Sequence, residues 1–129
     1  MHSNMIRHTV HLPGTLSANA SGVIPAFSNT GLKLLEAAAS SSNAGSATLK
    51  IGTKTDDDAY MTAKAIGVSN EPTHFTVKDF NGALGDALGV TCPQHAPKTV
   101  FTWTLDFDGA GGTAAADVDL VFTLLIGGV

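Results

Sequence analysis

Three aspartates near the C-terminal end of the chain, Asp106, Asp108 and Asp117, have the spacing of calcium ligands. Together with Gly111 they occupy positions 1, 3, 12 and 6 of an EF-hand-like loop. The match is incomplete, because position 5 is Ala110, position 12 is Asp where a bidentate Glu is typical, and the flanking segments have strand periodicity in place of helical periodicity. We therefore favour solvated carboxylates at strand ends and predict no metal site here, with calcium as the alternative.

A second acidic run, Asp56, Asp57 and Asp58, stands between two apolar segments. Three carboxylates with nearby backbone carbonyls have the donor atoms that a hard cation prefers. A charge run between two strands is more typical of a solvated turn, because an Asp side chain bonds to its own backbone there. We predict a turn.

The residues of nucleophilic and transition-metal chemistry do not form a recognisable set. The five histidines, at positions 2, 8, 11, 74 and 95, include no HExxH or other close ligand pair. His8 and His11 are predicted on opposite faces of a strand and cannot chelate together. Cys92 has His95 three residues on, which is too weak a pair for a thiol enzyme, and no G-x-S-x-G elbow is present. We predict no catalytic residue and no cofactor.

Two strand-like runs position the C-terminal aspartates. The first covers residues 100–108, in which apolar and polar side chains alternate with the period of a half-buried strand. The second covers residues 117–126, where the outer positions change from polar to apolar along the run, so its far end should be covered on both sides. The inward residues are Phe101, Trp103, Leu105 and Phe107 in the first run and Val118, Leu120, Phe122, Leu124 and Ile126 in the second.

The charges on these two runs argue against a plain hairpin. A hairpin closed by residues 109–116 would place Asp108 opposite Asp117 and Asp106 opposite Asp119, and like charges directly across a ladder are destabilising. Either a cation separates the carboxylates, or the runs lie in different sheets. Eight residues easily span the roughly 10 Å between packed sheets. We favour the crossing, which is typical of a jelly roll.

The rest of the chain also predicts strands. They cover residues 6–12, 31–40, 47–53, 59–66 and 73–80, with a loop or weak edge strand at 15–22 and a short segment at 23–27 whose Pro25 excludes a central position. Residues 31–40 also fit helical spacing, and we choose a strand because every neighbour is β. The prediction is an all-β, eight-stranded, jelly-roll-like β-sandwich: a single domain over residues 6–129, after a flexible N-terminal arm, residues 1–5.

Composition limits the partners. Only 14% of the 129 residues are charged, the net charge is −4 and the seven Lys and Arg are scattered, so we predict no nucleic-acid partner. No apolar run has the length of a signal peptide or of the roughly 18 residues that span a bilayer, so we predict no membrane partner. The hydrophobic fraction of 43% in so small a chain favours a homo-oligomer or a lattice partner.

Three segments carry a resemblance to a known class of protein. They are LKLLEAAASSSNAGSATLKIGT, the DDDAYMTAKAIG that follows, and FTWTLDFDGAGGTAAADVDLVFTLL. Together they resemble small tailed-phage virion structural proteins of the capsid decoration (cement) type. The resemblance implies a non-enzymatic jelly-roll protein, made in the host cytoplasm, that stabilises the major capsid protein lattice from the outer capsid surface as a homo-oligomer, with a trimer favoured.

Two segments are candidates for contact with the capsid or with other copies. One is the N-terminal arm, with Met1 and Met5, and the other is the loop over residues 81–89, with Leu84 and Leu88. The alternative function is a receptor- or carbohydrate-binding β-sandwich of a phage tail or adhesin. Sugar sites usually present aromatic platforms, and Tyr60 is the one obvious aromatic candidate outside the predicted core.

Overall fold

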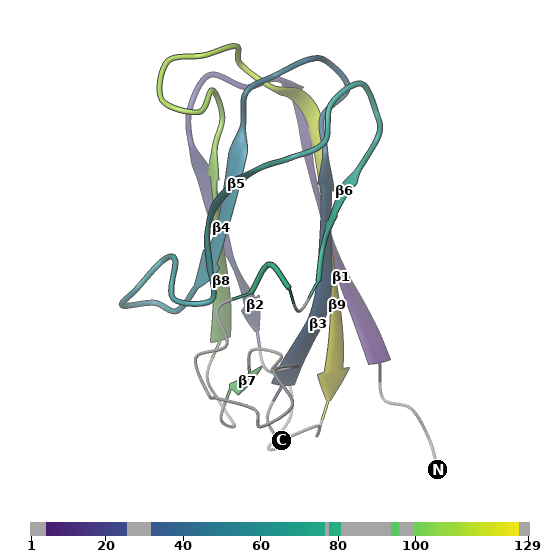
Figure 1. The fold of residues 1–129 in the computed structure, drawn as a ribbon, viewed down its shortest axis with the longest axis vertical. Coiled ribbons are helices and arrows are strands. Elements are labelled where there is room, and N and C mark those ends of the chain that lie inside the picture. The colour runs from purple at the N-terminus through teal and green to yellow at the C-terminus, as the bar shows by residue number, and fades with distance from the viewer. Residues whose placement is uncertain (1–4, 26–31, 77, 81–93, 96–99, 127–129) are drawn as a thin grey trace.

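The computed structural model describes residues 5–25, 32–76, 78–80, 94–95 and 100–126, which form two antiparallel β-sheets packed face to face (Figure 1). The first sheet has the order β1 (Met5–Thr15), β9 (Ala116–Ile126), β3 (Leu32–Ser40) and β6 (Thr73–Phe75), and the short β7 (Gln94–His95) also pairs with β3. The second sheet has the order β2 (Ala20–Pro25), β8 (Val100–Asp106), β4 (Thr48–Gly52) and β5 (Met61–Ala65).

The strand orders of the two sheets match position by position. The first sheet runs β1, β9, β3, β6 and the second runs β2, β8, β4, β5, so each position holds two neighbours in the sequence of the eight main strands. This is the topology of a jelly roll, in which strands that are neighbours in the sequence lie at matching positions of the two sheets. The prediction of an all-β, eight-stranded jelly-roll sandwich is confirmed.

The connection between β8 and β9 crosses from one sheet to the other, as the charge argument predicts. Asp106 pairs across the ladder with Thr48, and Asp119 pairs with His11 and Ser40, so neither carboxylate faces another across its own sheet. Most other connections cross as well, but β4 and β5 remain hydrogen-bonded in one sheet.

The core is formed by the inward positions of the central strands. On β8, Phe101, Trp103 and Leu105 are buried between outward positions that are half-buried. The four described inward residues of β9 from Val118 to Leu124 are fully buried, while Val121 and Leu125 on its outer face are half-covered. Both predicted faces are therefore confirmed over these residues. In the part of the chain that the structure describes, no helix is long and apolar enough to cross a membrane.

A β-bulge interrupts the alternation of side chains along β3. Leu34 pairs with Leu124 and Glu36 with Thr123, which leaves Leu35 as an extra residue. The bulge lengthens the interval between inward side chains, so Leu34 and Ala37 are both fully buried although they are three residues apart. An interval of three is helical spacing, but the strand prediction is the confirmed one.

Three strands differ most from their predicted boundaries, and the others agree to within two residues, with β8 ending at Asp106 before Phe107. β1 begins at Met5 and continues past Pro13 to Thr15, which an edge strand permits because its outer N–H groups need no partner. β2 is a single strand and lies at the edge of its sheet, as Pro25 requires. The strand predicted over residues 73–80 is wrong beyond Phe75, because the Asp79 carboxylate accepts a hydrogen bond from the Thr76 N–H and closes a turn there.

Candidate functional site

Asp106 and Asp108, the first two calcium candidates, accept hydrogen bonds from the loop that connects β8 to β9. Asp106 Oδ1 accepts hydrogen bonds from the N–H groups of Asp108 and Gly109, at 3.3 and 3.1 Å, and Asp108 Oδ1 accepts one from Ala110 N–H at 3.1 Å. Burial pushes the pKa of Asp106 upward, but hydrogen bonds from the loop outweigh it, so this pKa lies below its ordinary value. These two carboxylates therefore act as turn-forming groups.

The third calcium candidate is engaged elsewhere. Asp117 Oδ1 accepts a hydrogen bond from Gly14 N–H at 2.8 Å, and Asp117 Oδ2 accepts one from Ser42 Oγ at 3.2 Å. It thus joins the end of β1 to the connection between β3 and β4. Among the residues that the structure describes, Asp106, Asp108 and Asp117 do not form a group whose ligand atoms all lie within 4.8 Å of one another.

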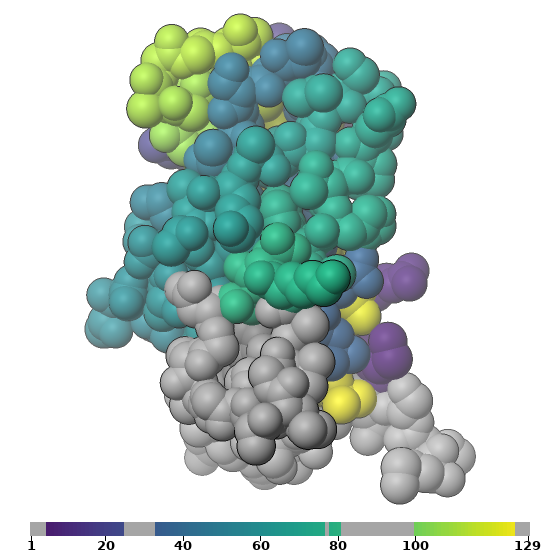
Figure 2. Space-filling view, viewed as in Figure 1, coloured from purple at the N-terminus to yellow at the C-terminus, as the bar shows by residue number. Residues whose placement is uncertain are grey.

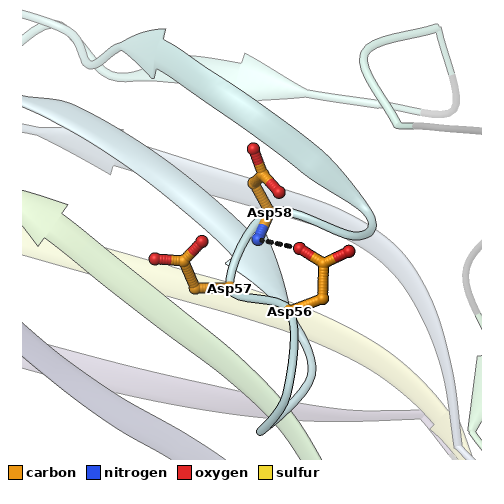
Figure 3. A group of neighbouring side chains, drawn as sticks. All are labelled: Asp56, Asp57 and Asp58. Atoms are coloured by element: carbon orange, nitrogen blue, oxygen red, sulfur yellow. Dashed lines mark hydrogen bonds between the residues drawn. The ribbon is translucent and has the colours of Figure 1, made fainter.

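The acidic run Asp56, Asp57 and Asp58 lies in the turn between β4 and β5 (Figure 3). One oxygen of each carboxylate lies within 4.8 Å of the others, and Asp58 N–H donates to Asp56 Oδ1 at 3.4 Å. Lys50 on β4 lies 3.4 Å from Asp57 and balances part of this charge. The hydrogen bond with the Asp56 side chain, followed by burial and the charges of Asp56 and Asp57, raises the pKa of Asp58. The structure gives the predicted turn, with crowded carboxylates.

The raised pKa predicts that Asp58→Asn stabilises the protein at neutral pH. A carboxyl group with a higher pKa in the folded state than in the unfolded state favours folding at acidic pH, below the unfolded value, and this contribution is lost as the pH rises through the folded value. We expect Asp58→Asn to raise the melting temperature at pH 7 more than at pH 3. Asp57→Asn is the matched control, because it removes a charge that is paired with Lys50. An equal gain from both variants at pH 7 would contradict the assignment.

The outer face of the first sheet carries a shallow groove of about 330 Å³. It is lined by small side chains on β9 and β3 and by longer polar side chains on all four strands of that sheet. We call it the outer groove, and its lining is Arg7, Glu36, Ala38, Ala39, Ser40, Pro72, His74, Asp119, Val121 and Thr123.

Two histidine–carboxylate pairs stand at the sides of the outer groove. His74 Nδ1 lies 2.6 Å from Glu36 Oε1, and His11 Nδ1 lies 2.6 Å from Asp119 Oδ1, with all four side chains largely exposed. The lining holds no Cys, and its only hydroxyls are those of Ser40 and Thr123. This set offers ionic and hydrogen-bonding contacts to a partner and contains no nucleophile with an adjacent base.

Sequence reasoning missed both pairs. The partners are 108 residues apart for His11 and Asp119 and 38 residues apart for His74 and Glu36, so only the strand register brings them together. The sequence contains only a weak signal for the first pair. His11 lies on the predicted solvent face of its strand, where a side chain on the neighbouring strand is the expected partner.

The structure places only some of the predicted contact residues. Met5 lies in β1, pairs with Leu125 and is 52% exposed. Met1, Leu84, Leu88 and Cys92 lie outside the described residues.

The aromatic residues are mostly unavailable to a ligand. Tyr60 is half-buried and makes an edge-to-face contact with Phe101, at 5.4 Å between ring centroids. Trp103 borders a shallow depression of about 290 Å³, but it is only 4% exposed because its indole lies over Gly22 on the neighbouring strand. The indole therefore fills the space between the sheets, as predicted.

Comparison with solved structures identifies a similar fold in a viral particle. A chain of the cyanophage Pam1 capsid asymmetric unit superposes with a TM-score of 0.53 at 14% identity, over 95% of this chain and 85% of that chain. The two chains share a fold. A chain of the acid-stable capsid of Helicobacter pylori bacteriophage KHP30 covers 94% of this chain at 13% identity, but its TM-score of 0.35 carries no argument. No family model and no curated protein matches the sequence.

Proposed function

We propose that this protein is a non-enzymatic virion structural protein that decorates and stabilises the outer surface of a phage capsid. The observation that carries the proposal is the fold shared with a chain of the Pam1 capsid over nearly the whole sequence. The three sequence segments that resemble decoration proteins support the same assignment independently. In the proposed arrangement the protein docks on the major capsid protein lattice as a homo-oligomer, with three copies as the favoured number.

The chemistry of the described surface supports a role in binding other proteins. Several of its carboxylates are hydrogen-bonded or ion-paired to backbone N–H groups, histidines or Lys50, and the outer groove combines small apolar side chains with ionic pairs. A protein that binds only the assembled shell stabilises that shell by mass action, so no catalytic step is required.

A carbohydrate- or receptor-binding sandwich is the alternative, and the aromatic residues weigh against it. Sugar platforms need exposed aromatic faces, whereas Trp103 is buried and Tyr60 packs edge-on against Phe101. A glycan array separates the two functions: specific binding to one class of glycan would favour the alternative.

The decisive test of decoration is co-sedimentation with capsids of the phage that encodes the protein. We expect the purified protein to sediment with capsids at a saturating and stoichiometric copy number and to raise their resistance to heat. The major capsid protein alone, before assembly, is the control, and we expect weak binding to it. Absence of binding to intact capsids would overturn the proposal.

The N-terminal arm is the first candidate for the contact. We expect deletion of residues 1–5 to reduce capsid occupancy at least tenfold, because an arm that becomes ordered on a neighbouring subunit adds binding surface. Met5→Ser in the full chain separates the contribution of the exposed Met5 side chain from that of the rest of the arm, since it keeps the first residue of β1. Unchanged occupancy of the deletion variant would exclude the arm and leave the loop with Leu84 and Leu88.

A further inference from the structure

Apart from the two-residue β7, the described sheets have four edge strands, and three of them carry features that prevent further pairing. β2 has six residues and ends at Pro25, and β6 has only three residues. β5 has five residues, its register against β4 is broken by a bulge, and its half-buried Lys64 lies opposite Leu49, a core residue. Short length, proline, bulges and inward charges are the devices by which sheets avoid edge-to-edge association.

The fourth edge, β1, has none of these devices over most of its length. It is eleven residues long, and its register with β9 is unbroken from Met5 to Leu12. Among the described strands it pairs with β9 alone, so its other side presents a row of main-chain N–H and C=O groups. In Figure 1 the N-terminal end of β1 lies at the lower right margin of the molecule, and in Figure 2 purple atoms of β1 are visible at the same margin.

Side-chain burial shows that the core-facing residues of β1 are also incompletely covered. The inward residues of β9 from Val118 to Leu124 are fully buried, whereas Ile6, Val10 and Leu12 on β1 pack on the same core but are only half-buried. The difference arises because no strand among the described residues covers the outer side of β1. An added strand would therefore bury apolar surface as well as satisfy main-chain groups.

We propose that β1 pairs antiparallel with β1 of a second copy of this chain, about a two-fold axis at Thr9. Opposite residues in an antiparallel pair project from the same face, so inward side chains must meet inward side chains. An axis at Thr9 places Ile6 opposite Leu12 of the second copy, and His8 opposite Val10. An axis at His8 would leave Leu12 opposite residue 4, which precedes β1, so the apolar rows match best at Thr9.

In the same register, the outward-facing side chains of the two β1 strands are also complementary. Thr9 meets Thr9 of the second copy, which is a favourable cross-strand pair. Arg7, which has no ion pair among the described residues, comes opposite His11 of the second copy. The His11 ring is bonded to Asp119 on the next strand, so the guanidinium approaches a carboxylate that is already in this row. The contact would form about eight main-chain hydrogen bonds between the two β1 strands.

This contact does not depend on the proposed attachment to a shell. A two-fold contact uses one surface twice, whereas a trimer is closed by two different surfaces, so β1 pairing joins either two single copies or two trimers. The expected mass in solution is therefore that of two or of six chains.

Cysteine cross-linking tests the register. In a Cys92→Ser background, Thr9→Cys places two thiols opposite each other at the axis, and we expect rapid formation of a covalent dimer on mild oxidation or with a short bismaleimide. Arg7→Cys is the matched control on the same exposed face of β1. Its two thiols would lie about 13 Å apart along the strands, so we expect its cross-linking to be at least tenfold slower.

A second pair of substitutions separates true pairing from random collision. Arg7→Cys and His11→Cys in one chain come opposite each other in the proposed register, so this double variant should cross-link as fast as Thr9→Cys, whereas each single variant should not. Equal cross-linking rates for Thr9→Cys and Arg7→Cys, or a monomeric mass at all concentrations, would overturn the proposal.

Discussion

Truncation of Trp103 to alanine is expected to lower the free energy of unfolding by about 3–5 kcal/mol. The indole is 4% exposed and lies across the ladder from Gly22. A Cβ added to that glycine would lie only 2.7 Å from the nearest ring atoms of Trp103. Its removal leaves a cavity in the core that the surrounding strands cannot fill without distorting their pairing. Urea unfolding followed by circular dichroism measures the loss.

The neighbouring residue on β8 provides the control for Trp103. Thr104 is on the outward face and half-buried, so Thr104→Ala should change the free energy of unfolding by no more than about 0.5–1 kcal/mol. Gly22→Val should cost about 1–3 kcal/mol alone, because the new side chain overlaps the indole. Combined with Trp103→Ala it should cost less than the sum of the two, because valine then enters the vacated space. Additive losses would show that the two residues do not share that space.

The second large effect is expected at Gly52, where the β4–β5 turn folds back on its own strand. A Cβ at Gly52 would lie 2.7 Å from the carbonyl oxygen of Asp57 and closer still to that of Asp56. Both obstacles are backbone atoms, and Gly52 has no positive φ, so the conflict is purely steric. We expect Gly52→Val to cost about 3 kcal/mol, because the whole turn must move.

A valine elsewhere in the same turn is the control for Gly52. Lys54 is exposed, so Lys54→Val should leave the free energy of unfolding within about 0.5 kcal/mol of the parent value. Gly52→Val should also disturb the pair between Lys50 and Asp57, which are held by that turn. Similar stability of the two valine variants would contradict the close approach.

The fold could be predicted from the sequence because its strongest signals are local and agree with one another. Phe101, Trp103 and Leu105 alternate with polar residues, and that period specifies a half-buried strand without knowledge of its neighbours. The separation of β8 and β9 into two sheets followed from a local conflict, the like charges that a hairpin would bring together. The bulge at Leu35 could not be predicted, since a single extra residue changes the interval between inward side chains and only the pairing with β9 reveals it.

The surface could not be predicted to the same extent, because its contacts depend on register. The partners of His11 and His74 come from other strands, and a shift of one residue would turn each of them to the other face. The aspartates at 106, 108 and 117 have the spacing of a calcium loop, but their contacts could not be predicted from that spacing. Asp106 and Asp108 accept hydrogen bonds within their own turn, whereas Asp117 bonds to Gly14 and Ser42, which are distant in the sequence.

The pairing of β1 with β9 has a consequence for how the protein is made. His11 and Asp119 face each other although 108 residues separate them, so β1 has no partner in its sheet until β9 has been synthesised. Until then the first sheet lacks a central strand, and its uncovered apolar residues favour aggregation. Synthesis of β9 is therefore the checkpoint, because a chain that stops before Ala116 has no strand to place between β1 and β3.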